Sequence, residues 1–300
     1  MTPGMSVVAW LTLSLSVTAA AQPGISAGSP AGSPAGAPAG AQAVTLVGAG
    51  DIARCESRRD EATARLLDAI GGTVFTTGDN AYPDGSASHF ASCYGPSWGR
   101  HRDRTRPSPG NHDYHTAEAA GYFGYFGTRA GPNDRGWYAY RRGTWRIYSL
   151  NSEVLSDAQL AWLRADLAAH TPHCSLAYWH RPLFSSGRHG GFGDARRLWR
   201  PLYRAGVELV INGHDHDYER FAGMRPDGSR SWRGIREFVV GTGGAKLRSF
   251  GAIEPHSVER NATSHGVLKL RLKDGAYAWR FVSVGGRYSD TGSARCHGRP

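Results

Sequence analysis

Two histidines, His214 and His216, directly follow a short apolar run in the stretch LVINGHDHDYER. Positions i and i+2 of an extended chain project to the same side, so both imidazoles can reach one object. Imidazole is the commonest metal ligand among side chains. The spacing therefore favours a metal site over two unrelated loop histidines, provided that other ligands converge on the same place.

Other polar clusters also lie at the end of an apolar run or in a glycine-led turn. In chain order, the full set is a Gly-Asp pair ending at Asp51, the stretch GDNAY from Gly78 to Tyr82, the stretch GNHD from Gly110 to Asp113, the single His180, and GHDH from Gly213 to His216. Each cluster alone is a weak signal, because Gly-Asp and Gly-His pairs commonly shape turns. All five together favour a metal site over turn-forming residues.

The elements that must position these clusters alternate between strand and helix patterns. We expect strands over 43–51, 72–80, 144–151, 174–180, 207–216, 236–244, 265–275 and 276–284, and helices over 58–70, 156–170 and 194–205, with Ser156 as the N-cap of the second helix. This alternation favours an α/β fold with mostly parallel sheets. In such folds ligands gather at the carboxyl ends of the strands, which is where the polar clusters occur.

In this order the motifs resemble those of the calcineurin-like metallophosphoesterases and, within them, the purple acid phosphatases. The family pattern runs DxG, GDxxY, GNH(D/E), a separate His and GHxH, and the resemblance covers Asp51 to His216. It implies an α/β fold in which a β-sandwich of two mixed sheets is flanked by helices. It also implies two metal ions, one held by Asp51, Asp79, Tyr82 and His216, and the other by Asp79, Asn111, His180 and His214.

The implied ligands make chemical sense for one trivalent and one divalent ion. Carboxylate and phenolate oxygens suit Fe(III), while an amide oxygen with two imidazoles suits Fe(II), Zn or Mn. The shared carboxylate of Asp79 would hold the ions roughly 3.5–4 Å apart. The first motif reads GDIA, with Ala53 where the family has Gly or a ligating His. The resemblance implies that Tyr82 replaces that ligand.

Two further histidines are candidates for catalysis. The family motif places His112 beside the ions, where it would hydrogen-bond the phosphoryl oxygens or the leaving group. His189 lies nine residues after His180, a spacing similar to that of a substrate-facing histidine in purple acid phosphatases, and is our candidate general acid. We expect Asp113, Asp215 and Asp217 to shape the loops by accepting backbone hydrogen bonds.

These observations predict an exported binuclear phosphatase that acts on a small phosphorylated substrate. A hydroxide made nucleophilic by the metals would attack the phosphorus of a phosphomonoester in line. A phosphodiesterase or nucleotidase on the same scaffold is the nearest alternative, and a secreted phosphate-binding protein without turnover is a distant one.

The net charge of +10 attracts anions, but we do not expect nucleic acid as a partner. The arginines are scattered along the chain and no basic helix stands out. The sequence does not indicate an oligomeric state.

The N-terminal residues resemble a targeting segment. We expect a signal peptide over 1–21, a linker rich in Ala, Gly, Pro and Ser over 22–43, and one metallophosphoesterase domain over 44–300. The apolar run from Val7 to Val17 is shorter than the about 20 residues that span a bilayer, so no stable membrane span is expected. No Lys or Arg precedes it, which leaves an uncleaved anchor or a misassigned start as alternatives.

An even number of cysteines in an exported chain favours disulfides. The four cysteines, Cys55, Cys93, Cys174 and Cys296, allow three pairings. We prefer Cys55 with Cys93 and Cys174 with Cys296, because each pair then joins neighbouring parts of the expected fold. Both the disulfides and the signal peptide predict a secreted or extracytoplasmic location.

Overall fold

The computed structural model describes residues 9, 11, 13–16 and 42–298. The chain divides into two units, Met1–Ala39 and Gly40–Pro300, and the described residues of the first unit form no helix or strand. Most residues of the expected signal peptide (1–21) and linker (22–43) lie outside the described residues, and both segments stay predictions. No helix in the described ranges has the length and apolarity needed to cross a membrane.

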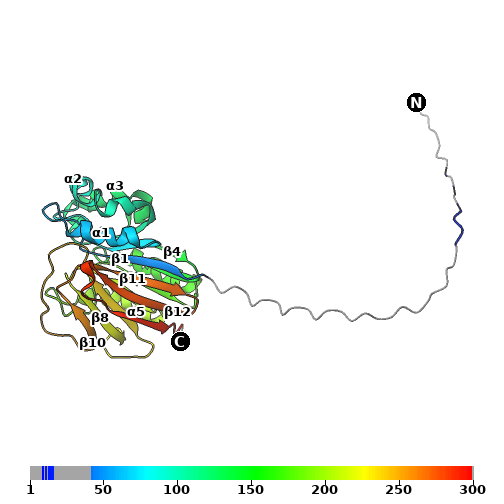
Figure 1. Cartoon of the computed structure of the whole chain (residues 1–300). Coiled ribbons are helices and arrows are strands. Elements are labelled where there is room, and N and C mark those ends of the chain that lie inside the picture. Colours follow the sequence, from blue (N-terminus) through cyan, green and yellow to red (C-terminus); the bar gives the residue numbers. More distant parts are fainter. Residues whose placement is uncertain (1–8, 10, 12, 17–41, 299–300) are drawn as a thin grey trace. The chain divides into compact units, whose positions relative to one another are not determined.

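Two β-sheets form the centre of the second unit (Figure 1). In spatial order the first sheet contains β13 (Thr291–Arg295), β12 (Ala276–Ser283), β11 (Gly266–Lys273), β1 (Val44–Ala49), β2 (Thr73–Thr77) and β3 (Thr105–Ser108). The second sheet contains β10 (Ser257–Asn261), β8 (Tyr218–Met224), β9 (Ile235–Val240), β7 (Leu209–Asn212), β6 (Ser175–Tyr178), β5 (Trp145–Ser149) and β4 (Tyr138–Arg142).

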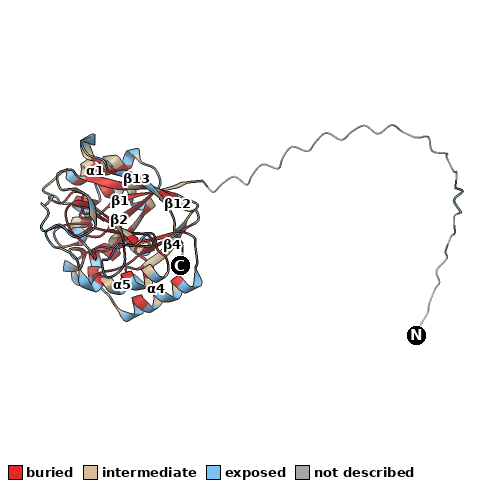
Figure 2. Ribbon diagram, turned by 90° about the horizontal axis from the view of Figure 1, so that it is seen from below, coloured by how far each residue is buried: buried red, intermediate tan, exposed pale blue. Residues whose placement is uncertain are grey.

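Helices cover the outer faces of this sandwich. On the first sheet this helix is α1 (Arg59–Ala69), and on the second sheet they are α4 (Asp157–Ala169) and α5 (Arg196–Arg204), whereas α2 (Ala87–His89) and α3 (Ala120–Phe126) pack against each other. The apolar sides of α4 and α5 pack on the second sheet, and Figure 2 shows their opposite sides exposed. The Ser156 side chain accepts a hydrogen bond of 3.2 Å from the Gln159 backbone N–H, so the expected N-cap of α4 is confirmed.

Parallel pairing occurs in two runs, β1–β2–β3 at one edge of the first sheet and β5–β6–β7–β9 within the second sheet. The other six of the eleven strand pairs are antiparallel. The mostly parallel sheets expected from strand and helix alternation are therefore wrong, whereas the mixed sandwich expected from the family resemblance is confirmed. The reason is local: β11 and β12 are joined by only Asp274 and Gly275, and so short a connection cannot make a parallel crossover.

Several strands have no counterpart among the expected elements, namely β3, β4, β8, β10 and β13. These strands are short, or their polar residues do not alternate regularly with apolar ones. The sequence TGSAR of β13 is an example. Such segments become strands because a neighbouring strand supplies hydrogen-bond partners, which is information that the local periodicity does not contain.

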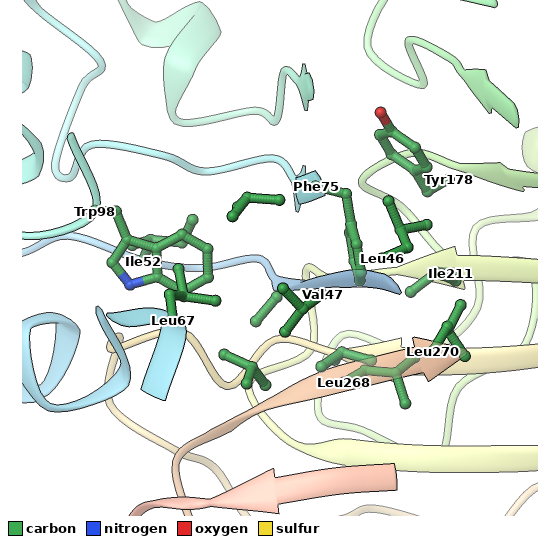
Figure 3. Close-up of a cluster of buried hydrophobic side chains, with 14 of the residues drawn as sticks. Leu46, Val47, Ile52, Leu67, Phe75, Trp98, Tyr178, Ile211, Leu268 and Leu270 are labelled. Carbon is green, nitrogen blue, oxygen red and sulfur yellow. The ribbon is translucent and has the colours of Figure 1, made fainter. Parts of the chain in front are cut away.

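An apolar layer between the two sheets holds their strand ends at one edge of the molecule. Val47 of β1 and Leu270 of β11 lie in the same buried cluster as Tyr178 of β6 and Ile211 of β7 (Figure 3). Alternate residues of the second sheet, such as Ala177 of β6, instead contact the layer beneath α4 and α5. This packing fixes the two sheets against each other and so aligns the loops that follow their parallel strands.

Both disulfides of the described chain have the preferred pairing, Cys55–Cys93 and Cys174–Cys296. Cys174 directly precedes β6 of the second sheet, and Cys296 directly follows β13 of the first sheet. The second bond therefore links the two sheets covalently.

Candidate metal centre

Both sheets contribute predicted ligands to one place. Asp51, Asp79 and Asn111 follow β1, β2 and β3 of the first sheet. His180 follows β6, and the pair His214 and His216 follows β7 of the second sheet. All six come after the carboxyl ends of parallel strands, as ligands do in α/β folds.

One group of these side chains surrounds the phenol oxygen of Tyr82. This oxygen lies 2.9 Å from Asp51 Oδ1, 3.0 Å from Asp79 Oδ2 and 3.1 Å from His216 Nε2. His216 Nε2 is also 3.3 Å from Asp51 Oδ1. All four residues are buried. The first predicted ligand set is thus assembled around a single point.

A second group surrounds Nε2 of His180. This nitrogen lies 3.0 Å from Asn111 Oδ1, 3.1 Å from His214 Nδ1 and 3.4 Å from Asp79 Oδ2. These are the members of the second predicted ligand set. Asp79 Oδ2 is the atom that the two groups share.

The donor atoms fit the binding of a metal ion. Asp51, Asp79 and His180 each offer a ligand atom, and these atoms all lie within 4.8 Å of one another. The first group is rich in oxygen and the second in nitrogen, which are the preferences of a harder and a softer ion. The structure brings all seven predicted ligands together, and their binding of metal stays a prediction.

Hydrogen bonds outside the centre orient two of the imidazoles. The Nδ1–H of His180 donates to the Thr77 carbonyl and that of His216 to the Lys246 carbonyl, each at 2.8 Å. Their Nε2 atoms are then directed into the centre, the tautomer that a metal ligand needs. His214 has the reverse orientation, with Nδ1 toward His180.

The ligand loops have a strained backbone. Asp51, Asp79 and His214 have φ values of 57°, 50° and 72°, in the left-handed region that non-glycine residues rarely occupy. Such conformations cost about 1–3 kcal/mol each and occur mainly at functional sites. The motif glycines give them room: a Cβ on Gly110 would lie 2.3 Å from Asp79 Oδ1, and one on Gly213 would lie 2.6 Å from Asp51 Oδ2.

Buried charges within the centre shift its pKa values in opposite directions. Burial acts to raise the pKa of Asp79, but the positive charge of His180 outweighs it and holds this pKa well below its usual value. Burial likewise opposes protonation of His180, yet Asp79 raises the pKa of His180 to about 10. Burial and then the carboxylates of Asp51 and Asp79 raise the pKa of Tyr82 well above its ordinary value. In the metal-free protein a proton on His180 thus offsets the negative charge of Asp79. In a metal-loaded protein a cation would offset that charge instead.

The candidate catalytic histidines lie at the rim of the centre. The backbone N–H of His112 donates to Asp79 Oδ1 at 2.8 Å, and its Nδ1–H donates to the Pro83 carbonyl at 2.6 Å. His112 Nε2 faces Asp79 Oδ2 at 3.9 Å. His189 is exposed, and the centroid of its ring lies 4.6 Å from the ring centroid of His214. Both histidines therefore border the centre without entering either ligand group.

The loop-shaping carboxylates behave differently from one another. Asp113 accepts from the backbone N–H groups of Asn80 and Gly110, and Asp215 from those of His189 and Gly190, as expected. Asp217 has no hydrogen-bond partner for either buried carboxylate oxygen, so that expectation is wrong for this residue. Burial, followed by repulsion from Asp215, raises the pKa of Asp217 well above its usual value.

Three arginines near the centre were not anticipated from the sequence. Arg248 contacts His189 Nε2, Arg181 lies 3.4 Å from His214 Nε2, and the guanidinium of Arg54 lies 5.2 Å from the centre of the Tyr82 ring. Arg181 directly follows a predicted ligand, which was an available signal. Arg54 and Arg248 belong to no motif, and only the fold shows that they border the centre.

Two mixed sheets flanked by helices, with a buried cluster of oxygen and imidazole donors at their junction, define a metal-binding α/β sandwich. Residues 45–218 match the calcineurin-like phosphoesterase family. The chain belongs to this family. The membership agrees with a phosphoric ester hydrolase, the class of enzyme expected from the sequence.

Individual relatives agree with the purple acid phosphatase-like branch. Human acid phosphatase type 7 is 26% identical over 210 residues, covering 56% of this chain and 47% of the relative. The uncharacterized protein Rv2577 of Mycobacterium tuberculosis is 26% identical over 187 residues, covering 50% of this chain and 35% of that protein. The chain thus spans less than half the length of the curated relatives it matches.

Solved structures with the same fold have low sequence identity. Purple acid phosphatase PPD1 from yellow lupin aligns with a TM-score of 0.65 at 19% identity, over 85% of this chain and 54% of that one. GAP50 of Plasmodium aligns with a TM-score of 0.65 at 15% identity, over 86% and 90%. These likenesses concern the fold.

We predict that Gly110→Ala weakens metal binding by about 10–100-fold, which is the usual effect of losing a group that orients a metal ligand. The added methyl group would overlap Asp79 Oδ1 and displace the shared carboxylate. Metal content after dialysis against a graded chelator measures the effect. Gly124→Ala is the matched control, because a Cβ there meets no atom within 4 Å. Equal metal retention by both variants, with both folded, would contradict the placement of Asp79.

Proposed function

We propose that this chain is an exported, binuclear metal-dependent phosphatase that hydrolyses phosphomonoesters. The observation that carries the proposal is the division of seven donor side chains into two groups that share Asp79 Oδ2. Family membership supports the reaction class. Export rests on the expected signal peptide and is supported by two disulfides, which persist in oxidising compartments.

The first group would hold Fe(III), and the second Fe(II), Zn or Mn. A phenolate and two carboxylates offer hard oxygens, and the second group offers two imidazoles and an amide. When bound, two such ions supply an activated water and offset the negative charge of the phosphoryl group. The raised pKa of Tyr82 in the metal-free protein means that its proton leaves only when a strongly charged cation compensates it.

The side chains at the rim would bind and orient the substrate. Because the Nδ1–H of His112 is held by the Pro83 carbonyl, its Nε2 is directed toward the centre, where the imidazolium form would donate from Nε2–H to a phosphoryl oxygen. Arg181 and Arg248 would add guanidinium donors, which match the geometry of phosphate oxygens. Arg181 is itself held by Glu153 through hydrogen bonds of 2.9 and 3.1 Å, so it is already oriented.

His189 is proposed as the general acid that protonates the leaving alkoxide. Its position beside His214 supports this role, because a substrate bound at the centre would bring its ester oxygen to the same rim. His189 contacts Arg248 in the free protein. This contact would have to break when substrate binds, because His189 would protonate the leaving group and Arg248 would bind the phosphate. Burial lowers the pKa of His189 in the free protein; the carboxylate of Asp215 opposes this effect, and the charge of Arg248 adds to it.

Two alternatives use the same scaffold. A phosphodiesterase or nucleotidase needs the same activated water. The described residues of the centre do not distinguish a phosphomonoester from a phosphodiester. A non-catalytic protein is the other: GAP50 is described as the anchor in the inner membrane complex of Plasmodium and has this fold. The complete set of seven donors in this chain favours catalysis over anchoring.

The reaction class is tested with metal-loaded protein and a panel of phosphoesters. We expect hydrolysis of nitrophenyl phosphate to exceed that of the bis-nitrophenyl diester, and Asp79→Asn to lose activity on both because the shared ligand loses its charge. Faster diester cleavage would favour the phosphodiesterase. The absence of turnover on any ester by protein that retains two metals would favour the non-catalytic protein.

Iron-loaded protein should show a visible tyrosinate-to-iron charge-transfer band that Tyr82→Phe abolishes. The phenol is expected to ligate Fe(III) directly, and phenylalanine has no oxygen to donate. Absorption spectra of the two proteins at equal iron content measure the band. A colour that persists in Tyr82→Phe would assign the first ion to other ligands.

His189→Ala should slow hydrolysis of an alkyl phosphate by about 10²–10⁴-fold, the usual contribution of a general acid. It should leave nitrophenyl phosphate nearly unaffected, because nitrophenolate departs without protonation. His170→Ala, at an exposed position after α4, is the control. Equal losses of kcat on both esters would indicate a structural or binding role for His189.

A further inference from the structure

The surface of α5 is strongly basic. Its apolar residues Leu198, Trp199 and Leu202 are buried against the second sheet. The remaining positions of the sequence RRLWRPLYR supply arginines at positions 196, 197, 200 and 204, of which 197, 200 and 204 are exposed. The expectation that no basic helix stands out is therefore wrong. The signal was available, because residues 196, 200 and 204 fall on one side of the helix expected over 194–205.

A groove between α4 and α5 gathers more positive charge. It has a volume of about 590 Å³, and its walls include Arg164 from α4 and Arg197, Arg200 and Arg204 from α5. Within the described ranges the side chains of Arg164, Arg200 and Arg204 have no hydrogen-bond or ion-pair partner. Their guanidinium groups are thus free to bind an external anion.

The basic surface continues onto the β8–β9 connection. A second hollow lies beside the groove and is lined by Arg200, Arg204 and Arg225. A third joins Arg204 to Arg233. Arg196 Nε donates to the Pro226 carbonyl at 2.8 Å and so attaches this connection to α5. We call the whole surface the arginine face; its members are Arg164, Arg196, Arg197, Arg200, Arg204, Arg225 and Arg233.

This face accounts for a large part of the excess charge. Two acidic residues, Asp157 and Asp227, line the same hollows as its seven arginines, which leaves five excess positive charges out of the chain's +10. None of the residues that line these hollows belongs to the metal centre. Because α5 packs on the outer face of the second sheet, the positive charge of the arginine face lies on a surface other than the proposed phosphatase site.

An exposed tryptophan adjoins the arginine face. The Trp232 side chain is 79% exposed, and the Arg233 guanidinium lies 4.7 Å from the centre of its ring. Such exposure is unusual for the largest apolar side chain. Tryptophan beside arginine is typical of surfaces that meet the headgroup region of a bilayer, where the indole is apolar on its faces and polar at its N–H.

We propose that the arginine face docks this protein on anionic phospholipid bilayers. Guanidinium groups pair with phosphate oxygens, and each Arg near an anionic surface contributes about 1 kcal/mol of attraction. Trp232 would enter the headgroup layer beside them. Single-stranded nucleic acid is disfavoured, because its recognition uses successive stacking platforms and Trp232 is the one large exposed aromatic that the described part of this surface offers.

The test is sedimentation of the purified full chain with vesicles. Vesicles of equal parts phosphatidylglycerol and phosphatidylcholine should bind the protein, and vesicles of phosphatidylcholine alone should not. Binding should weaken as added salt shortens the screening length. The double variant Arg200→Gln/Arg204→Gln should lower the partition coefficient about 30-fold, because each of the two lost charges contributes about 1 kcal/mol of attraction to the surface. Trp232→Ala should weaken binding without changing its salt dependence.

The matched control is Arg271→Gln/Arg280→Gln, which removes the same net charge from exposed positions of β11 and β12. This control should bind as the wild type does, and both double variants should keep wild-type melting temperatures and phosphatase activity. Any contribution of the apolar N-terminal residues is common to all these proteins and cancels in the comparison. Equal losses in the two double variants, or equal binding to both kinds of vesicle, would overturn the proposal.

Nucleic acid is examined in the same series with a labelled duplex and a labelled single strand at the ionic strength of the vesicle assay. We expect weak binding that is insensitive to Trp232→Ala. Binding to either oligonucleotide that is tighter than binding to the anionic vesicles, and that is lost in Arg200→Gln/Arg204→Gln, would assign the arginine face to nucleic acid and overturn the membrane proposal.

Discussion

The arrangement of the centre depends on one buried carboxylate, that of Asp79. Its Oδ2 atom is 3.0 Å from the Tyr82 phenol oxygen and 3.4 Å from His180 Nε2, so it is the only described atom common to both donor groups. A carboxylate in this position is costly to bury unless positive charge accompanies it. In the metal-free protein His180 provides that charge, and in a loaded protein two cations would do so.

The fold maintains this carboxylate through packing and through local strain. The apolar layer between the sheets brings the end of β2 beside the ends of β6 and β7, because residues of both sheets interdigitate in one core. The tight loop at the end of β2 then turns Asp79 inward with a positive φ of 50°. Neighbouring glycines are required because any side chain at Gly110 would occupy the space of the carboxylate.

The distribution of arginine suggests a division of tasks between two surfaces. Arg181 and Arg248 border the metal centre and suit a small phosphoester, whereas the arginine face on α5 suits an extended array of phosphates. Both rest on the same chemistry of guanidinium and phosphate. They differ in geometry: the first converges on one point at the junction of the sheets, and the second spreads over the outer face of the second sheet.

The amino-acid sequence by itself predicted most of the longer strands and helices and a preferred cysteine pairing, and its resemblance to a known family implied the class of enzyme and the seven candidate donors. These properties are carried by local patterns: an apolar run with its period, a cap such as Ser156, or a polar residue after a glycine. Strands without such a pattern, such as β13, were not predictable, because their hydrogen-bond partners lie elsewhere in the chain.

The tertiary structure alone decided the approach of Arg248 to His189, the unpartnered carboxylate of Asp217 and the continuity of the arginine face. Each of these joins residues that are distant in sequence or that become neighbours only through the turn of a helix. Their contacts arise when the two sheets pack against each other and against α5. A linear pattern contains the donors and the charges, but only the packed fold brings them within interacting distance.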